Sequence, residues 1–134
     1  MKLVADFRRV QISKTSDSEV FFQQACIVDD EGRILTAFDD LTSALEIDFQ
    51  RPEFVDLFLD AIDKALDRTR VWQGNCFSIE ADSNFLYIEN CDQETFSGPF
   101  KITGVVELMK VWREFLRTSR PLEHAIRSDD LVVK

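Results

Sequence analysis

The chain has 134 residues, of which 45% are hydrophobic, and it carries a formal net charge of −9 at neutral pH. That length and apolar content predict a single domain spanning residues 1–134 and exclude a disordered chain. No apolar run reaches the roughly 20 residues that span a bilayer, and the N-terminal residues are too charged for a secretory signal, so we expect a cytoplasmic protein.

The negative charge is concentrated in one part of the chain. Between Thr15 and Asp67 there are fourteen acidic residues and three basic ones. Such a field should repel nucleic acid and anionic membranes and attract a basic protein partner. A simpler interpretation is that the charge serves solubility alone, because small domains often carry a net charge of this size.

The first third of the chain has apolar patterns that are typical of strands. A strand is predicted over Lys2–Ser13, then a polar loop at Lys14–Glu19, then apolar runs at Val20–Val28 and Arg33–Phe38. The acidic stretch between these runs ends in Gly32, which can take a positive φ, so a hairpin turn is predicted. These acids could also suggest calcium, but the twelve-residue loop of oxygen ligands is missing.

The next segment, Asp39–Arg51, fits two structures. Its first residues could cap a short helical turn, because acidic and hydroxyl side chains accept bonds from free backbone N–H groups. The stretch Ala44–Phe49 instead alternates apolar and acidic residues, as a half-buried strand does. The pattern leaves both alternatives open.

A long helix is predicted over Pro52–Arg70, with Pro52 suited to its first turn. At about 100° per residue, apolar side chains gather on one face. That face consists of Phe54, Val55, Phe58, Leu59, Ile62, Ala65 and Leu66. Five carboxylates share an arc of roughly 80° opposite it. They are Glu53, Asp56, Asp60, Asp63 and Asp67. Like charges at these spacings repel, so the row is not expected to stabilise an isolated helix.

After this helix the sequence predicts further strands. They are expected at Cys76–Ala81 and Phe85–Glu89, joined by turn residues, and at Gln93–Ile102. Gly98-Pro99 interrupts the last of these, which favours an edge strand or a bend.

A second helix, Gly104–Thr118, would bury Trp112 with its apolar neighbours. The terminal Asp129–Lys134 would add a β edge or fray. Because most strands are joined by hairpin-sized links, the predicted class is α+β, a mainly antiparallel or mixed sheet packed against two principal helices, about 52–70 and 104–118.

No catalytic, cofactor or metal motif is present. The glycines are scattered and form no phosphate-binding loop. Cys26, Cys76 and Cys91 lack the spacing of a zinc site, and His124 has no second histidine beside it. Carboxylates are so numerous that a catalytic pair could be drawn almost anywhere. We therefore expect a protein that is not an enzyme and uses no cofactor or metal.

A small, acidic, single-domain cytosolic chain without catalytic motifs resembles the immunity proteins of bacterial contact-dependent growth inhibition and related toxin systems. The resemblance is one of class and spans the whole chain. It implies a cognate toxin, often a nuclease, that is bound tightly and blocked at or near its active site. Carboxylates on a rigid helix can steer such a basic partner and mimic a phosphate backbone.

The predicted contact surface follows from the acidic helix. It comprises Glu53, Asp56, Asp60, Asp63 and Asp67, with Trp72 as either a packing residue or an exposed anchor. The neighbouring acids that could extend it are Asp39, Asp40, Glu46 and Asp48. The alternative function is a non-catalytic bacterial accessory or adaptor protein whose acidic surface serves solubility. It would pair with itself through an edge strand or through exposed apolar residues near Gly98-Pro99.

Overall fold

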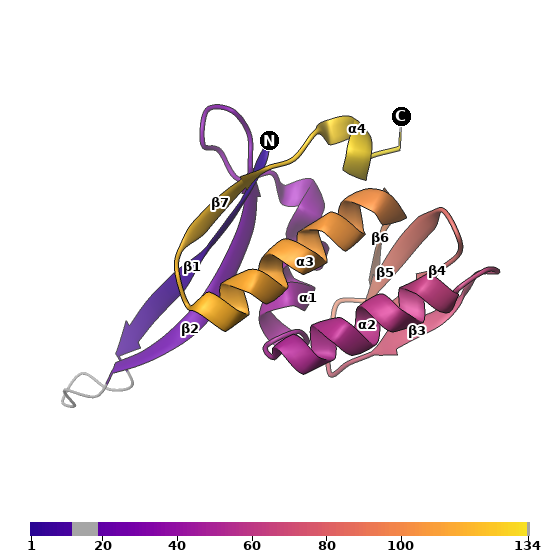
Figure 1. Cartoon of the computed structure of the whole chain (residues 1–134), viewed down its shortest axis with the longest axis horizontal. Coiled ribbons are helices and arrows are strands. Elements are labelled where there is room, and N and C mark those ends of the chain that lie inside the picture. Colours follow the sequence, from indigo (N-terminus) through magenta and orange to yellow (C-terminus); the bar gives the residue numbers. More distant parts are fainter. Residues whose placement is uncertain (12–18, 134) are drawn as a thin grey trace.

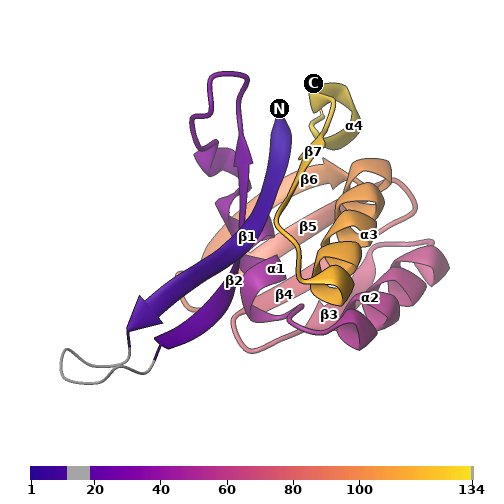
Figure 2. The same ribbon diagram turned by 60° about the vertical axis from the view of Figure 1, so that its left-hand side comes forward.

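The computed structural model describes residues 1–11 and 19–133, which form two antiparallel sheets and four α-helices (Figures 1 and 2). The elements follow in the order β1 (Lys2–Gln11), β2 (Glu19–Val28), η1 (Thr36–Phe38), α1 (Asp39–Ile47), α2 (Pro52–Lys64), β3 (Thr69–Gln73), β4 (Phe77–Ala81), β5 (Phe85–Asn90), β6 (Thr95–Lys101), α3 (Ile102–Thr118), β7 (Leu122–Ala125) and α4 (Ser128–Leu131). The end of the predicted first strand and most of the predicted Lys14–Glu19 loop lie outside the described residues.

The strands divide between two sheets. One has the order β2-β1-β7, and the other has the order β3-β4-β5-β6. In Figures 1 and 2, α2 and α3 lie side by side over the four-stranded sheet, and α1 lies between the two sheets. The α+β class is therefore confirmed, and every strand pairing in it is antiparallel.

One continuous core joins both sheets and the helices, with Trp112 among its fully buried side chains. The indole Nε1 of Trp112 donates to the backbone oxygen of Phe49 at 2.7 Å, so the polar atom of this large side chain is satisfied. The ring of Phe115 lies 5.0 Å from Trp112 and 5.1 Å from Phe7, which ties α3 to β1. The prediction that Trp112 is a core residue is confirmed.

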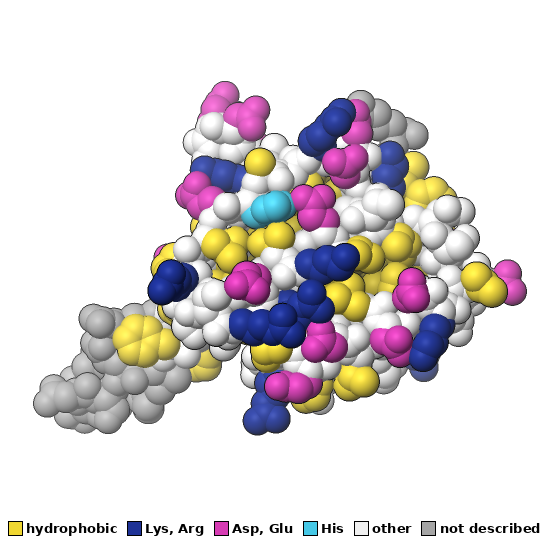
Figure 3. All heavy atoms as spheres, in the orientation of Figure 1, with side chains coloured by type: hydrophobic (Ala, Val, Ile, Leu, Met, Phe, Trp, Pro, Cys, Tyr) yellow, Lys and Arg dark blue, Asp and Glu magenta, His cyan; other side chains and the backbone are white. Residues whose placement is uncertain are grey.

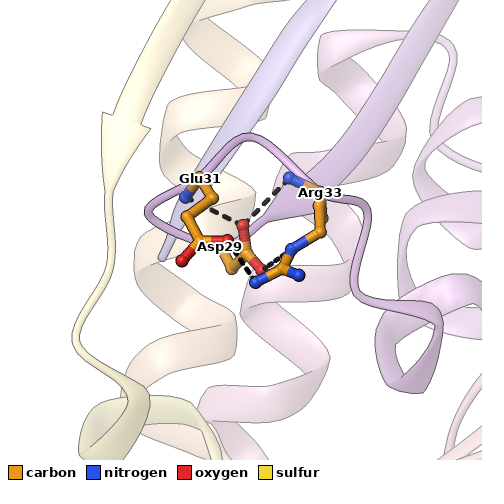
Figure 4. A network of polar contacts seen from close by, with 3 residues as sticks. All are labelled: Asp29, Glu31 and Arg33. Carbon is orange, nitrogen blue, oxygen red and sulfur yellow. Dashed lines mark hydrogen bonds and ion pairs between the residues drawn. The ribbon is translucent and has the colours of Figure 1, made fainter.

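The turn after β2 is held together by Asp29 (Figure 4). Its Oδ1 accepts the backbone N–H groups of Glu31 and Arg33, each at 2.9 Å, and Arg33 Nε donates to Oδ2 at 3.1 Å. Gly32 has a φ of +83°, as the predicted turn requires. The backbone N–H of Arg33 is the main cause that lowers the pKa of Asp29. The Asp29 carboxylate therefore stabilises the turn.

The strand predicted at Arg33–Phe38 is wrong. Ile34 makes an isolated bridge to Val28, and the chain then enters η1 and α1. The helical alternative for Asp39–Arg51 is correct, because Leu41 and Leu45 come round to the same side as the buried Phe38. Their burial in the core selects the helix over the strand in a segment whose local pattern fits both structures.

The helix predicted over Pro52–Arg70 ends early, at Lys64. Ala65 is already extended, and Thr69–Gln73 becomes the edge strand β3. Val55, Phe58 and Ile62 are buried as predicted, whereas Leu66 is 78% exposed. Thr69 and Val71 favour a strand, and β3 pairs with β4 on either side of an irregularity at Val71.

The rest of the chain follows the prediction more closely. β4 and β5 form the expected hairpin, and β6 is the expected edge strand. α3 begins at Ile102, two residues before the predicted start, and ends at Thr118 as predicted. β7 was not expected. The terminal segment forms α4 and a bridge from Val132 to Phe100, with Leu131 fully buried, so it packs on the domain.

Candidate functional site

An apolar surface on the face shown in Figure 3 lies between α2 and the N-terminal half of α3. It is a groove of about 520 Å³. Its lining consists of Leu59, Asp60, Ile62, Asp63, Ala65, Leu66, Ser83, Ile102, Val106 and Lys110. Hydrophobic side chains are visible there between acidic side chains on the α2 side and basic ones along α3. The groove therefore combines an apolar floor with a charged rim.

The amphipathic pattern of α2 produces this arrangement. Its buried side faces the core, and its opposite side presents Glu53, Asp56, Asp60 and Asp63, all of which are exposed. The apolar residues of α2 extend beyond the buried side, since Leu57 is 61% exposed. Because the helix stops at Lys64, Asp67 leaves the predicted row and lies in the connection to β3, where it is exposed.

The acidic row is partly neutralised. Asp56 lies 2.7 Å from Nη1 of Arg113 and 3.8 Å from Nη2 of Arg117, both on α3. Asp60 pairs with Lys64 at 2.8 Å, and this pairing is the main cause that raises the pKa of Lys64. The middle of the predicted strip is therefore bound within the protein rather than presented as free negative charge.

The ends of the row keep their charge. Within residues 1–11 and 19–133, no salt bridge involves Glu53, Asp63 or Asp67. Asp63 stands on the rim of the groove, and Asp67 follows the exposed Leu66 that lines it. We define the acidic groove as the lining residues above together with Asp67. Its free carboxylates lie at the C-terminal end of α2.

The acids predicted to extend the surface have other partners. Asp39 is exposed at the start of α1, but Asp40 accepts a hydrogen bond from the Ser97 hydroxyl. Glu46 accepts the backbone N–H of Ala25 at 2.8 Å, which satisfies a donor on the edge strand β2. Burial raises the pKa of Glu46, and that hydrogen bond opposes the rise. The carboxylates of Asp40 and Glu46 therefore accept hydrogen bonds from other parts of the domain.

Asp48 is buried, with 7% of its surface exposed. Burial raises the pKa of Asp48, while the backbone N–H of Asn75 and the Trp72 indole favour its charged form. Among the described residues, neither Asp48 Oδ2 nor Trp72 Nε1 has a hydrogen bond of ordinary geometry, so the indole acts on the carboxylate as a nearby dipole. Asp48 is not part of the candidate surface.

Trp72 is half-buried and packs against aromatic rings of the core. Its ring centre lies 4.7 Å from that of Phe49 and 6.2 Å from those of Phe54 and Phe58. Of the two roles left open by the sequence, packing is the one these contacts support, because the ring faces Phe49 and Phe58 inside the core. Trp72 lies outside the acidic groove.

The chain matches no family model, no curated protein and no solved structure. Within the described part of the chain, no cluster of three or more histidine, cysteine or acidic side chains could hold a metal ion. Each described helix is too short or too polar to cross a lipid bilayer.

Sequence reasoning missed the apolar half of the site. Ile102 was predicted to end the strand Gln93–Ile102 and Val106 to lie in the second helix, with no indication that either would line a groove with Leu59. One signal was present. The apolar positions of α2 cover more than one helix face, so some of them had to remain exposed or meet a partner.

Proposed function

We propose that this protein is an acidic binding module that neutralises a basic protein, as immunity proteins of bacterial toxin systems do. The observation that carries the proposal is the acidic groove. Its floor includes the exposed Leu66, and the free carboxylates of Asp63 and Asp67 stand beside it. An apolar floor with carboxylates on its α2 side fits a partner segment whose apolar side chains are flanked by lysine or arginine.

A nuclease toxin offers that chemistry. Its substrate is a chain of phosphates, so its cleft must carry positive charge. The net charge of −9 would draw such a protein in by long-range attraction, and the carboxylates near the end of α2 would take the place of phosphates. The apolar floor would then hold the complex together through contacts that salt does not screen.

The test compares two double variants that remove the same charge. Asp63→Asn with Asp67→Asn alters the groove, and Asp30→Asn with Glu31→Gln alters the turn after β2, at the upper edge of the molecule and away from α2 (Figure 1). Tagged proteins are used to capture partners from bacterial cells that encode the chain, and each captured partner is assayed for nuclease activity. Wild type and the turn variant should bind and inhibit one basic nuclease.

The groove variant should bind that nuclease at least about tenfold more weakly, a loss of roughly 1.4 kcal/mol. Its association should also depend less on salt. Equal weakening by both double variants would show that net charge matters and the groove does not. Capture of an acidic partner, or of a basic partner without nuclease activity, would overturn the nuclease assignment.

A second function, that of a self-associating accessory or adaptor protein, is favoured by the edge strand β6. Phe96 is 77% exposed there, and it lines a hollow of about 500 Å³ with Pro99 and Val133. An apolar pair of copies would be insensitive to salt and would dissociate when Phe96 is replaced by serine. Sedimentation of wild type and Phe96→Ser at two salt concentrations separates this function from the first.

A further inference from the structure

Two cysteines face one another across the open end of the β4–β5 hairpin. The register of this hairpin pairs Phe77 with Asn90, so the next residues outward, Cys76 and Cys91, are opposite each other. The backbone N–H of Cys91 donates to the oxygen of Cys76 at 2.8 Å, which continues the ladder by one rung. Directly opposite residues of an antiparallel pair project their side chains on the same face of the sheet.

We propose that Cys76 and Cys91 form a dithiol site that low-molecular-weight disulfides convert to an intramolecular disulfide. Opposed residues in a hydrogen-bonded antiparallel pair have Cα atoms about 5.5 Å apart. Disulfides bridge Cα separations of roughly 4.4 to 6.8 Å, so the bond requires rotation of the side chains and little movement of the backbone. This site is independent of the proposed toxin binding.

The two thiols differ in access. Cys91 is exposed and Cys76 is half-buried, so Cys91 is the thiol that an incoming disulfide meets first. A hydrogen bond to the Asp92 carboxylate is the main cause that raises the pKa of Cys76, and burial and the charges of Asp92, Asp48 and Cys91 add to the rise. Cys76 is therefore suited to the second, intramolecular step, where proximity compensates for a small thiolate fraction.

Cys26 cannot substitute for either member of the pair. It lies on β2 in the three-stranded sheet, whereas the pair lies on the four-stranded one. Burial raises the pKa of Cys26, and the charge of Glu46 adds to the rise. The chain thus contains its own comparison thiol, half-buried and without a cysteine opposite it.

The chemistry is thiol–disulfide exchange, and the only reactant besides the protein is the low-molecular-weight disulfide. The Cys91 thiolate attacks one sulfur of oxidised glutathione, forms a mixed disulfide and expels one glutathione thiolate. The Cys76 thiolate then attacks the Cys91 sulfur and expels the second glutathione. Two protein thiols are oxidised, one disulfide is reduced to two thiols, and the two protons released by the cysteines end on the glutathione molecules.

The experiment treats the folded full chain with oxidised glutathione, traps free thiols with iodoacetamide and maps peptides by mass spectrometry. Cleavage after glutamate separates residues 76 and 91 at Glu80 and Glu89, so a disulfide joins two peptides. The expected product is lighter by two hydrogens, with Cys26 alkylated. Cys26→Ser should give the same product, and Cys91→Ser should form no intramolecular disulfide.

Asp92→Asn tests whether ring closure depends on the environment inferred above. Loss of the carboxylate removes the leading cause of the raised pKa of Cys76, so the second step should become faster near neutral pH. A stable glutathione adduct on Cys91 in wild type would overturn the proposal. So would a bond that joins two molecules or involves Cys26.

Discussion

The carboxylate of Asp56 lies 2.7 Å from the guanidinium of Arg113, so α3 neutralises the middle of the acidic row on α2. This ion pair joins residues 57 positions apart in the chain. The acidic row therefore attracts a basic partner less strongly than its number of carboxylates indicates, because a charge that is already compensated contributes little to that attraction. The uncompensated charge beside the groove is that of Asp63 and Asp67, toward and just beyond the C-terminal end of α2.

The ion pair predicts that Asp56→Asn destabilises the protein slightly instead of relieving repulsion. An exposed pair of this kind contributes about 0.2–1 kcal/mol. Urea unfolding at low salt should show a loss of that size, and the loss should shrink as salt is added. Arg113→Gln provides a double-variant cycle with Asp56→Asn. A gain in stability for Asp56→Asn would mean that repulsion along α2 dominates.

Asp48 predicts a pH dependence of stability. Its pKa is raised in the folded protein, so the folded state binds a proton more readily than the unfolded chain, where aspartate titrates near pH 3.9. The stability contributed by this proton is present at low pH and is lost as pH rises through the raised pKa. Asp48→Asn does not titrate, so its stability relative to wild type should increase over that pH window.

The measurement is urea unfolding of both proteins at several pH values between about 3.5 and 7. The difference in unfolding free energy should grow with pH and then level off. A difference that stays constant across the range would show that Asp48 titrates alike in the folded and unfolded states. Asp39→Asn removes the same charge at an exposed position on α1 and is measured beside it as the reference variant.

Gly74 should not tolerate a side chain, because a Cβ there would lie 2.0 Å from Oδ2 of Asp48. We expect Gly74→Ala to cost about 1–3 kcal/mol, the usual cost of overpacking. The same replacement in an Asp48→Ala background should cost less, since the clashing carboxylate is gone. Thermal unfolding of the four proteins measures this coupling. Equal costs in the two backgrounds would contradict the close approach.

Trp112→Phe should destabilise the core more than its loss of volume implies. It removes the donor that satisfies the backbone oxygen of Phe49, and a buried unsatisfied acceptor costs about 1–3 kcal/mol. Trp72→Phe is the control, because its indole makes no hydrogen bond of ordinary geometry within the described residues. Circular dichroism follows both unfolding curves. A larger cost for Trp72→Phe would reverse this ranking of the two indoles.

The parts of the fold that could be predicted are those whose local pattern and tertiary contacts agree. The buried side of α3 and the β4–β5 hairpin are examples, since each has a clear period and a clear boundary. The segment Asp39–Arg51 could not be decided locally, because its alternation suits a strand, whereas burial of Leu41 and Leu45 requires a helix. The C-terminal end of α2 could not be predicted locally either, because it is set by the pairing of β3 with β4 farther along the chain.

The candidate site likewise has a part that could be predicted from the sequence and a part that could not. The carboxylates of α2 follow from sequence spacing, which places them on one side of a helix. Their pairing does not, because Arg113 reaches Asp56 only when α3 packs beside α2. The groove likewise needs Leu59 and Val106 to face each other from two helices.

The position of β1 between β2 and β7 has a consequence for synthesis of the chain. Lys2 and Glu123 form an ion pair although they are 121 positions apart. At about 5–20 residues per second, translation takes roughly 6–24 s to add that interval. During this time one edge of β1 lacks the strand that will cover it, and Leu3 and Ala5 lack their complete surroundings. The three-stranded sheet can therefore be completed only after Leu122–Ala125 have been added to the chain.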